Sequence, residues 1–303
     1  MPPDNHGRPP KSGEAATAPY AILAPDRQTL PLVFASPHSG RDYTDEFLAQ
    51  SRLDISELRR SEDAFVDELF AAAPELGAPM LKALFPRAYI DPNRQPWELD
   101  REMFSDYLPV LFFDIIESSP HLAVGLGCIP RIITSGERIY RGQIRFEEAK
   151  RRMETYYIPY HHALKGLLEK TQEQFGGCLL IDCHSMPSIG GPMDKDSGDK
   201  RVDMVLGDCH GAACLPGITA AAETALAEMG FVVTRNSPYS GGYTTRHYGK
   251  IANRVHALQI EINRALYMDE LAFQRGPGLP ALKQRIGGLI EALAAAARRV
   301  LAA

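Results

Sequence analysis

One short apolar run that stops abruptly in polar residues constrains the fold of this chain more than any other stretch. Residues 179–185 read Leu-Leu-Ile-Asp-Cys-His-Ser. Such a run is typical of a buried strand in an α/β sheet. Ligands of open α/β sheets bind in the crevice outside the carboxyl ends of the strands. We therefore expect His184 to lie at the edge of a sheet and to face a crevice.

Two further stretches have a related pattern. Residues 32–40 read Leu-Val-Phe-Ala-Ser-Pro-His-Ser-Gly, so His38 also follows an apolar run. Residues 257–264 read Ala-Leu-Gln-Ile-Glu-Ile-Asn-Arg and place Glu261 inside a strand-like run. Two histidines at strand ends and a glutamate with apolar neighbours suggest a metal hydrolase.

The order of the predicted elements indicates the fold class. Strands alternate with helices along almost the whole chain, which is typical of α/β layers around a mostly parallel or mixed sheet. Pro159 is expected to kink or interrupt the longest helix. The expected strands cover residues 30–36, 78–83, 179–181, 202–207, 231–234 and 257–263, and the expected helices cover residues 45–51, 54–73, 146–174, 215–229 and 279–301.

The remaining segments define the domain organisation. Residues 1–18 contain much Pro, Gly and Asp but little apolar sequence, so they are expected to be a disordered tail. No linker divides residues 19–303, which we interpret as a single catalytic domain. Residues 95–120 look irregular and could form a lid or an insertion, and residues 236–249 are predicted to be a loop rich in glycine and tyrosine.

Composition narrows the partners and the compartment. The net charge is −5 and no long basic run occurs, so binding of nucleic acid is not expected. Five cysteines without a Cys-x-x-Cys pair favour reduced thiols. No stretch has the pattern of a signal peptide or a membrane span, so we expect a cytoplasmic protein that does not enter a membrane.

The histidines suggest a metal site. A catalytic zinc ion takes three protein ligands from histidines and carboxylates and leaves one position for water. His38 and His184 are the best candidates, and Glu62 or Asp63 could supply the carboxylate because both interrupt an apolar helical stripe. The alternative for each histidine is a hydrogen-bonded residue of the core or of a turn.

Glu261 has two interpretations. On a strand, its neighbours Ile260 and Ile262 point to the opposite face. A carboxylate in such a setting is costly unless paired, and its pKa can rise to a value useful for a general base. The alternative is a salt bridge, for example to Arg264.

Several arginines lie beside predicted turns and strand ends, where they suggest an acidic substrate or a stabilised oxyanion. The alternative is ordinary surface arginine. Ser39 and Ser185 lack the Gly-x-Ser-x-Gly pattern of a serine hydrolase, and no phosphate-binding glycine loop occurs. The candidate arginines are Arg87, Arg94, Arg131, Arg141 and Arg246.

Six pieces of the sequence, in this order, resemble the N-formylglutamate amidohydrolase family. That family is similar in fold to zinc carboxypeptidases and aspartoacylase, which implies a three-layer α/β/α domain with a mixed central sheet and one divalent metal, most often zinc. The pieces are Pro37-His-Ser-Gly40, Ser61-Glu-Asp-Ala-Phe-Val-Asp-Glu-Leu69, Tyr89-Ile-Asp-Pro-Asn-Arg94, Ile181-Asp-Cys-His-Ser185, Gly241-Gly-Tyr-Thr-Thr-Arg-His-Tyr-Gly249 and Leu258-Gln-Ile-Glu-Ile-Asn-Arg264.

The resemblance implies a set of metal ligands. His38 and His184 would bind the metal together with Asp63, which matches the aspartate of the family in the helix that follows. Glu62 stays open as an alternative. Related enzymes use a His-x-x-Glu pair, but position 41 is Arg41 here, so the carboxylate must come from elsewhere.

The resemblance also implies catalytic and substrate-binding roles. Glu261 matches the general base, and Arg87 resembles the arginine that stabilises the oxyanion. Asn93 and Arg94 look like the pair that holds a substrate carboxylate, with Arg246 as a further partner of the substrate.

The implied reaction is metal-assisted hydrolysis of N-formyl-L-glutamate to formate and L-glutamate, a late step of histidine degradation. One rival is the deacylation of another N-acyl amino acid, such as an N-acetyl or N-succinyl substrate, or a carboxypeptidase-like peptidase. A rival from another class is a metal- or ligand-binding protein without turnover.

Overall fold

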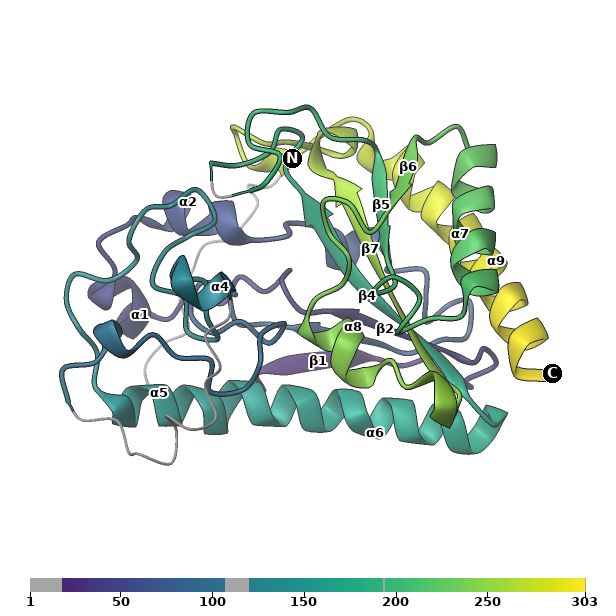
Figure 1. Ribbon diagram of the computed structural model, residues 1–303, viewed down its shortest axis with the longest axis horizontal. Coiled ribbons are helices and arrows are strands. Elements are labelled where there is room, and N and C mark those ends of the chain that lie inside the picture. The colour runs from purple at the N-terminus through teal and green to yellow at the C-terminus, as the bar shows by residue number, and fades with distance from the viewer. Residues whose placement is uncertain (1–17, 107–119, 193, 303) are drawn as a thin grey trace, which may run out of the picture.

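A twisted seven-stranded sheet forms the centre of the computed structural model, which describes residues 18–106, 120–192 and 194–302 (Figure 1). Its strand order is β1-β3-β2-β4-β7-β5-β6, and β3, β2, β4 and β7 are parallel. β1 and β5 run antiparallel to their neighbours β3 and β7, so the sheet is mixed. The strands are β1 (Tyr20–Leu23), β2 (Leu32–Ser36), β3 (Met80–Ala83), β4 (Cys178–Met186), β5 (Met204–Gly207), β6 (Val233–Arg235) and β7 (Val255–Asn263).

Helices cover both faces of this sheet. α3 (Val66–Leu69), α7 (Pro216–Glu228) and α9 (Leu279–Ala302) pack on one face, and α5 (Phe146–Arg152) with α6 (Ile158–Phe175) lie along the other (Figure 1). The residues of each strand alternate between two apolar cores, as the period of two requires. The predicted three-layer α/β/α architecture with a mixed central sheet is therefore confirmed.

The long helical segment is continuous but contains a wider turn. Between α5 and α6 the residues Met153–Tyr157 form a π-helical turn, in which the backbone N–H of Ile158 donates to the carbonyl of Met153. Pro159 lacks an N–H, and in an α-helix its ring would clash with the carbonyl four residues before. A π turn accommodates such an interruption, so the expected effect of Pro159 is confirmed.

The predicted helix over residues 54–73 is wrong. The structure has a short α2 (Ile55–Leu58), a 3₁₀ turn (Arg59–Ser61), an extended stretch and then α3. Phe65 has the left-handed φ of 65°, and the N–H of Asp63 donates to the carbonyl of His38 at 3.0 Å. This contact with a distant residue takes the place of a helical bond, so tertiary structure overrides the helical pattern.

Two further boundaries differ from the predictions. The predicted loop 236–249 contains α8 (Tyr243–Tyr248). The strand β4 does not stop at its polar residues but continues to Met186, so His184 lies inside a strand. The other described elements are α1 (Asp45–Gln50), α4 (Pro120–Ala123), the 3₁₀ turns Arg101–Met103, Ile251–Asn253 and Arg264–Leu266, and the short strands β8 (Met268–Asp269) and β9 (Gln274–Arg275).

Two sequence predictions concern segments outside the described residues. The tail predicted for residues 1–18 falls almost entirely on residues 1–17, and the possible lid or insertion at 95–120 includes residues 107–119. Within the described residues, none of the helices combines the length and the hydrophobicity needed to cross a membrane.

Candidate active site

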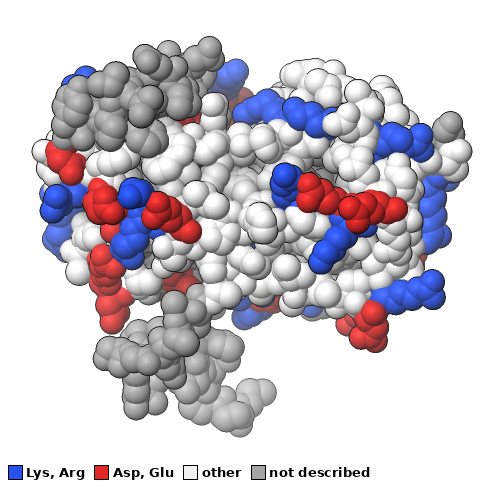
Figure 2. All heavy atoms as spheres, turned by 90° about the horizontal axis from the view of Figure 1, so that it is seen from below, with Lys and Arg blue, Asp and Glu red and all other residues white. Residues whose placement is uncertain are grey.

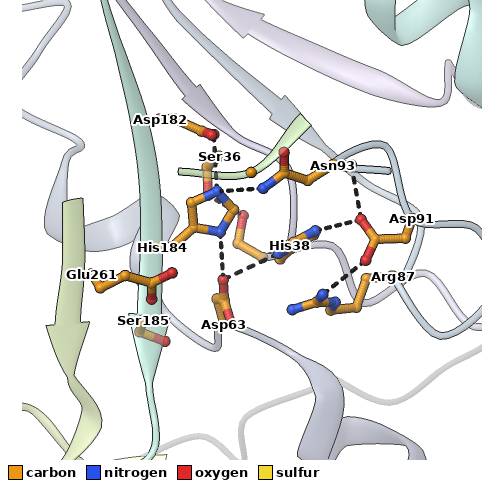
Figure 3. A network of polar contacts seen from close by, with 12 residues as sticks. Ser36, His38, Asp63, Arg87, Asp91, Asn93, Asp182, His184, Ser185 and Glu261 are labelled. Carbon is orange, nitrogen blue, oxygen red and sulfur yellow. Dashed lines mark hydrogen bonds and ion pairs between the residues drawn. The ribbon is translucent and has the colours of Figure 1, made fainter. Parts of the chain in front are cut away.

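Three side chains from separate parts of the chain meet near the carboxyl ends of β2 and β4 (Figure 3). Nδ1 of His38 lies 3.3 Å from Oδ2 of Asp63, and Nδ1 of His184 lies 3.0 Å from the same oxygen. All three side chains are buried, and they offer ligand atoms within 4.8 Å of one another. The structure thus brings together the three residues that were predicted as metal ligands.

The second nitrogen of each histidine faces another carboxylate. Nε2 of His38 lies 2.7 Å from Oδ1 of Asp91, and Nε2 of His184 lies 2.9 Å from Oδ1 of Asp182. A carboxylate on one ring nitrogen holds the proton there and leaves the lone pair of the other nitrogen for a metal. This arrangement therefore presents both Nδ1 atoms, beside Oδ2 of Asp63, as ligand atoms.

The backbone directs Asp63 to the histidines and Glu62 away from them. Oδ1 of Asp63 accepts a hydrogen bond from Nη2 of Arg264 at 3.1 Å, which leaves Oδ2 for the two histidines. The carboxylate of Glu62 accepts a hydrogen bond from the hydroxyl of Tyr43 at 2.8 Å and a second one from Arg59. Of the two candidate carboxylates, only Asp63 is placed to bind a metal with the histidines.

Glu261 on β7 lies opposite His184 on β4, because the two strands pair in parallel with these residues in register (Figure 3). Oε1 of Glu261 accepts a hydrogen bond from Nε2 of Gln259 at 2.8 Å, and Ile260 and Ile262 pack into the core on the opposite face. Burial raises the pKa of Glu261 to about 7, although the nearby His184 lowers it in part. A carboxyl group with such a pKa can accept and return a proton near neutral pH.

Asp91 fixes Arg87 beside the metal-ligand group. Nη2 of Arg87 lies 2.7 Å from Oδ2 of Asp91, whose Oδ1 also accepts a hydrogen bond at 2.8 Å from the backbone N–H of Asn93 (Figure 3). Burial would raise the pKa of Asp91, but the charges of Arg87 and His38 hold it well below its usual range. A single carboxylate therefore orients both a candidate metal ligand and the candidate oxyanion-binding arginine.

The side chain of Asn93 is engaged inside the protein. Its Oδ1 accepts a hydrogen bond from the backbone N–H of Thr244 at 2.8 Å, and its Nδ2 lies 3.2 Å from Nε2 of His184. Gly242 leaves room for it, because a Cβ there would lie 2.3–2.6 Å from the amide atoms of Asn93. Asn93 thereby joins the start of α8, which carries Arg246, to a candidate metal ligand.

Arg94 and Arg246 bind backbone carbonyls with part of their guanidinium groups. Arg94 donates to the carbonyl of Leu126 at 2.8 Å, and the exposed Arg246 donates to the carbonyl of Gly241 at 2.6 Å. Since a guanidinium has five N–H donors, both retain donors for a carboxylate of a substrate. The charge of Arg94 also lowers the pKa of His121 to about 4, which places an additional histidine, not predicted from the sequence, near these arginines.

The structure places the other two candidate arginines elsewhere. Arg131 forms an ion pair of 2.9 Å with Glu102. Arg141 lines a separate cavity of ≈ 470 Å³ beside α5, and none of the residues brought together around His38 and His184 lines that cavity. For these two arginines the structure shows roles other than that of a partner in the candidate active site.

The donor set fits a divalent metal ion. Two imidazole nitrogens and one carboxylate oxygen are typical ligands of catalytic zinc. The four carboxylates and two guanidinium groups around the ligand atoms leave an excess of two negative charges, which a divalent cation would balance. Burial would raise the pKa of Asp63, but hydrogen bonds from His184 and His38 hold it well below its usual range. The six charged groups are Asp63, Asp91, Asp182, Glu261, Arg87 and Arg264.

Three of these groups were not predicted to act on the metal ligands. Asp182 precedes His184 by two residues on the same strand, so the period of two could have placed both on one face. Arg264 was expected as a partner of Glu261 but instead donates to a candidate metal ligand. For Asp91 the sequence carries no local signal, because its contact with the histidine spans 53 residues.

Comparisons with known proteins agree with this site. The sequence model of the N-formylglutamate amidohydrolase family matches residues 30–268. The N-formylglutamate deformylases of Pseudomonas putida and Pseudomonas aeruginosa are each 29% identical to the chain, and the matches cover 82% and 83% of it and 86% and 87% of the relatives. The crystal structure of N-formylglutamate amidohydrolase from Ralstonia eutropha JMP134 has a TM-score of 0.80 and 33% identity, with 94% of this chain and 98% of that one covered.

The fold and the site, together with these matches, define a hydrolase that acts on a linear amide bond. The chain belongs to the N-formylglutamate amidohydrolase family. A protein of Agrobacterium tumefaciens, 16% identical with a TM-score of 0.66 over 92% of this chain and 96% of that one, shares the fold.

Proposed function

We propose that this protein hydrolyses N-formyl-L-glutamate to formate and L-glutamate with the help of a divalent metal ion, most probably in the form of Zn²⁺. The observation that carries this proposal is the position of Glu261 opposite His184, beside the carboxylate oxygen of Asp63 that both histidines face. The names of the two Pseudomonas relatives and of the Ralstonia structure support the choice of substrate.

We assign the metal to Nδ1 of His38, Nδ1 of His184 and Oδ2 of Asp63. When bound there, a divalent ion supplies the Lewis acidity that activates water and polarises an amide carbonyl. Asp91 and Asp182 orient the two imidazoles through their Nε2 atoms and fix the protons there.

Glu261 is assigned as the general base and acid. Its carboxylate takes a proton from the attacking water and returns it to the amide nitrogen, so that the C–N bond breaks and the amine of L-glutamate leaves. Arg87, held by Asp91 at 2.7 Å, donates hydrogen bonds to the carbonyl oxygen as negative charge develops on it.

Arg94 and Arg246 are assigned to the carboxylates of the substrate. A guanidinium binds a carboxylate with two parallel hydrogen bonds, which fixes orientation as well as charge. We assign Asn93 to the same part of the site as a residue that supports it, because its amide joins α8 to His184.

We place this reaction late in the degradation of histidine and in the cytoplasm, with residues 19–303 as one catalytic domain. The buried thiols among the described residues, which form no disulfide, support a reducing compartment. The single sheet that contains strands from Tyr20 to Asn263 supports one domain.

The experiment that tests this proposal is the release of formate from N-formyl-L-glutamate, measured with chelator and then with zinc added back. We expect activity that the chelator abolishes and zinc restores, and slower release from N-acetyl- and N-succinyl-glutamate. Zinc binding in a 1:1 ratio without release of formate would overturn the substrate, and activity unaffected by chelation would overturn the metal.

A further inference from the structure

The segment from Arg87 to Arg94 carries four candidate site residues, yet it forms neither helix nor strand. Its carbonyl groups therefore lack the partners that regular structure would supply. Buried backbone carbonyls nearly always accept a hydrogen bond from some other donor. The donors that serve this segment determine how firmly its side chains are held.

Three carbonyls of this segment accept hydrogen bonds from side chains of one continuous helical segment, α5 to α6. The donors come from the α5 end, from the π turn and from the second turn of α6. The contacts are Nη1 of Arg152 to the carbonyl of Tyr89 at 2.9 Å, the hydroxyl of Tyr157 to the carbonyl of Arg94 at 2.7 Å, and Nε2 of His161 to the carbonyl of Pro92 at 2.9 Å.

The π turn explains why these side chains share one face of the helix. In an α-helix with 3.6 residues per turn, positions five apart point about 140° away from each other. Arg152 and Tyr157 are five residues apart and flank a turn in which the hydrogen bond spans five residues. The additional residue in this turn brings both side chains to the same side, and His161 follows four residues later.

Arg152 is built into the protein as a fixed donor. Its side chain is fully buried, its guanidinium lies 3.9 Å from the ring centroid of Tyr89, and its Nε donates to Glu148 at 2.8 Å. The hydroxyl of Tyr140 lies 2.6 Å from the same Nη1 that binds the carbonyl of Tyr89. A guanidinium with several fixed partners loses little additional freedom when it binds that carbonyl.

His161 connects the segment to α8 as well. Because a carbonyl can only accept, Nε2 of His161 carries the proton that binds Pro92, and Nδ1 accepts a hydrogen bond from the hydroxyl of Tyr248 at 2.9 Å. Tyr248 belongs to α8, the helix of Arg246. One histidine thus bridges the two segments that carry the candidate substrate-binding arginines.

The outer face of the same helical segment has a different character. There, charged side chains pair on the surface, for example Lys165 with Glu169 at 3.5 Å and Arg151 with Glu46 at 3.0 Å. Figure 2 looks onto this side of the molecule and shows positive and negative side chains interspersed. The buried donors are therefore distinct from the solvated face that the helix presents outward.

We propose that Arg152, Tyr157 and His161 are positioning residues for the reaction proposed above. They fix the segment from Arg87 to Arg94, so that Arg87 and Arg94 meet the substrate in one geometry. None of the three touches the reacting atoms, and each acts through a backbone carbonyl. The assignment of kinetic effects rests on the proposed function, whereas the effect on the segment itself does not.

The test combines hydrogen exchange with kinetics on the full-length protein. Tyr157→Phe and His161→Leu each remove one donor, and His161→Gln restores an N–H that can reach the carbonyl of Pro92. Tyr156→Phe is the matched control, because it removes a hydroxyl from the same turn while its ring continues to pack on Phe85. Exchange in peptides that cover residues 86–95 is compared with the rest of the protein.

For Tyr157→Phe and His161→Leu we expect exchange in this segment to rise about three- to tenfold, the range for loss of one hydrogen bond. KM should rise by a similar factor with a smaller change in kcat. His161→Gln should return both values toward wild type, and Tyr156→Phe should change neither. Unchanged exchange in both donor-deleted variants would overturn the proposal. Faster exchange in a protein that does not hydrolyse N-formyl-L-glutamate would uphold the positioning role and refute the substrate.

Discussion

The carboxylate of Asp91 accepts a hydrogen bond of 2.7 Å from Nε2 of His38. Its second oxygen binds Arg87 at 2.7 Å, so one buried side chain serves both a candidate metal ligand and a candidate catalytic arginine. Neither partner adjoins Asp91 in sequence, and the connection exists only because β2 and β3 lie side by side in the sheet. Such a shared carboxylate couples metal binding to the stabilisation of the transition state.

Asp91→Asn should weaken zinc binding by roughly 10- to 100-fold, the range for carboxylates that orient metal-binding histidines. An amide is a weaker acceptor for His38 and presents an N–H to Arg87, which must then turn away. Competition with a chromogenic chelator measures the affinity. Asp199→Asn makes the same chemical change at an exposed position and should leave zinc binding as in wild type. Equal affinities in the two variants would show that Asp91 does not orient the ligand.

The raised pKa of Glu261 predicts how the stability of the metal-free protein depends on pH. Burial raises this pKa from 4.5 to about 7, so the folded state binds more protons than the unfolded state between these values. The contribution of Glu261 is fully present below pH 4.5 and is lost as the pH rises through about 7. At about 1.4 kcal/mol per pKa unit, the loss is of the order of 3 kcal/mol.

Glu261→Gln removes this ionisation. Without metal, we expect the variant to be more stable than wild type at pH 8 by roughly 2–4 kcal/mol and nearly equal to it at pH 5. Urea unfolding at the two pH values, in the presence of chelator, measures the difference. A difference of the same size at both pH values would mean that Glu261 does not ionise in this range.

Arg246→Met should raise KM for N-formyl-L-glutamate by about 10- to 100-fold, because loss of a charged hydrogen bond costs roughly 1.5–3 kcal/mol. Arg246 is exposed and donates to the carbonyl of Gly241, so its removal leaves the core intact. Lys250→Met, two residues beyond α8, is the control for a change of charge near the site. Steady-state kinetics separates KM from kcat, and an equal loss in both variants would point to a general field effect.

Gly242→Ala should destabilise the protein, because the new Cβ would lie 2.3–2.6 Å from the side-chain amide of Asn93. Such overpacking costs typically 1–3 kcal/mol, and here it also displaces Asn93 from His184. Gly166→Ala is a matched control in α6, where a Cβ meets open space, and it should stabilise by about 0.5–1 kcal/mol. Urea unfolding of both variants decides, and a neutral Gly242→Ala would contradict the described packing.

The alternation of strands and helices predicted the architecture because the apolar runs of β2, β4 and β7 carry it locally. The break before α3 was not predicted, although the polar residues 61–63 marked it as an interruption of the apolar stripe. What opens the helix is the contact of Asp63 with His38, 25 residues away. A pattern of apolar residues cannot contain this contact, because it arises only once the sheet has formed.

The same reasoning separates the predicted from the unpredicted parts of the site. His38 and His184 stood out because each follows an apolar run, and Glu261 stood out because of its aliphatic neighbours. The residues that act through another side chain or a carbonyl, such as Asp91 and Tyr157, have no such signature. Their partners lie far away in the sequence, at distances of 53 and 63 residues.

The central claim is that Glu261 transfers the proton while His38, Asp63 and His184 hold the metal. The most direct measurement compares formate release and zinc content of wild type and Glu261→Gln, both loaded with zinc. We predict that the variant binds zinc in a 1:1 ratio, as wild type does, but releases formate about 10²- to 10⁴-fold more slowly, the contribution of a general base. Undiminished release by a variant with full zinc content would contradict the account.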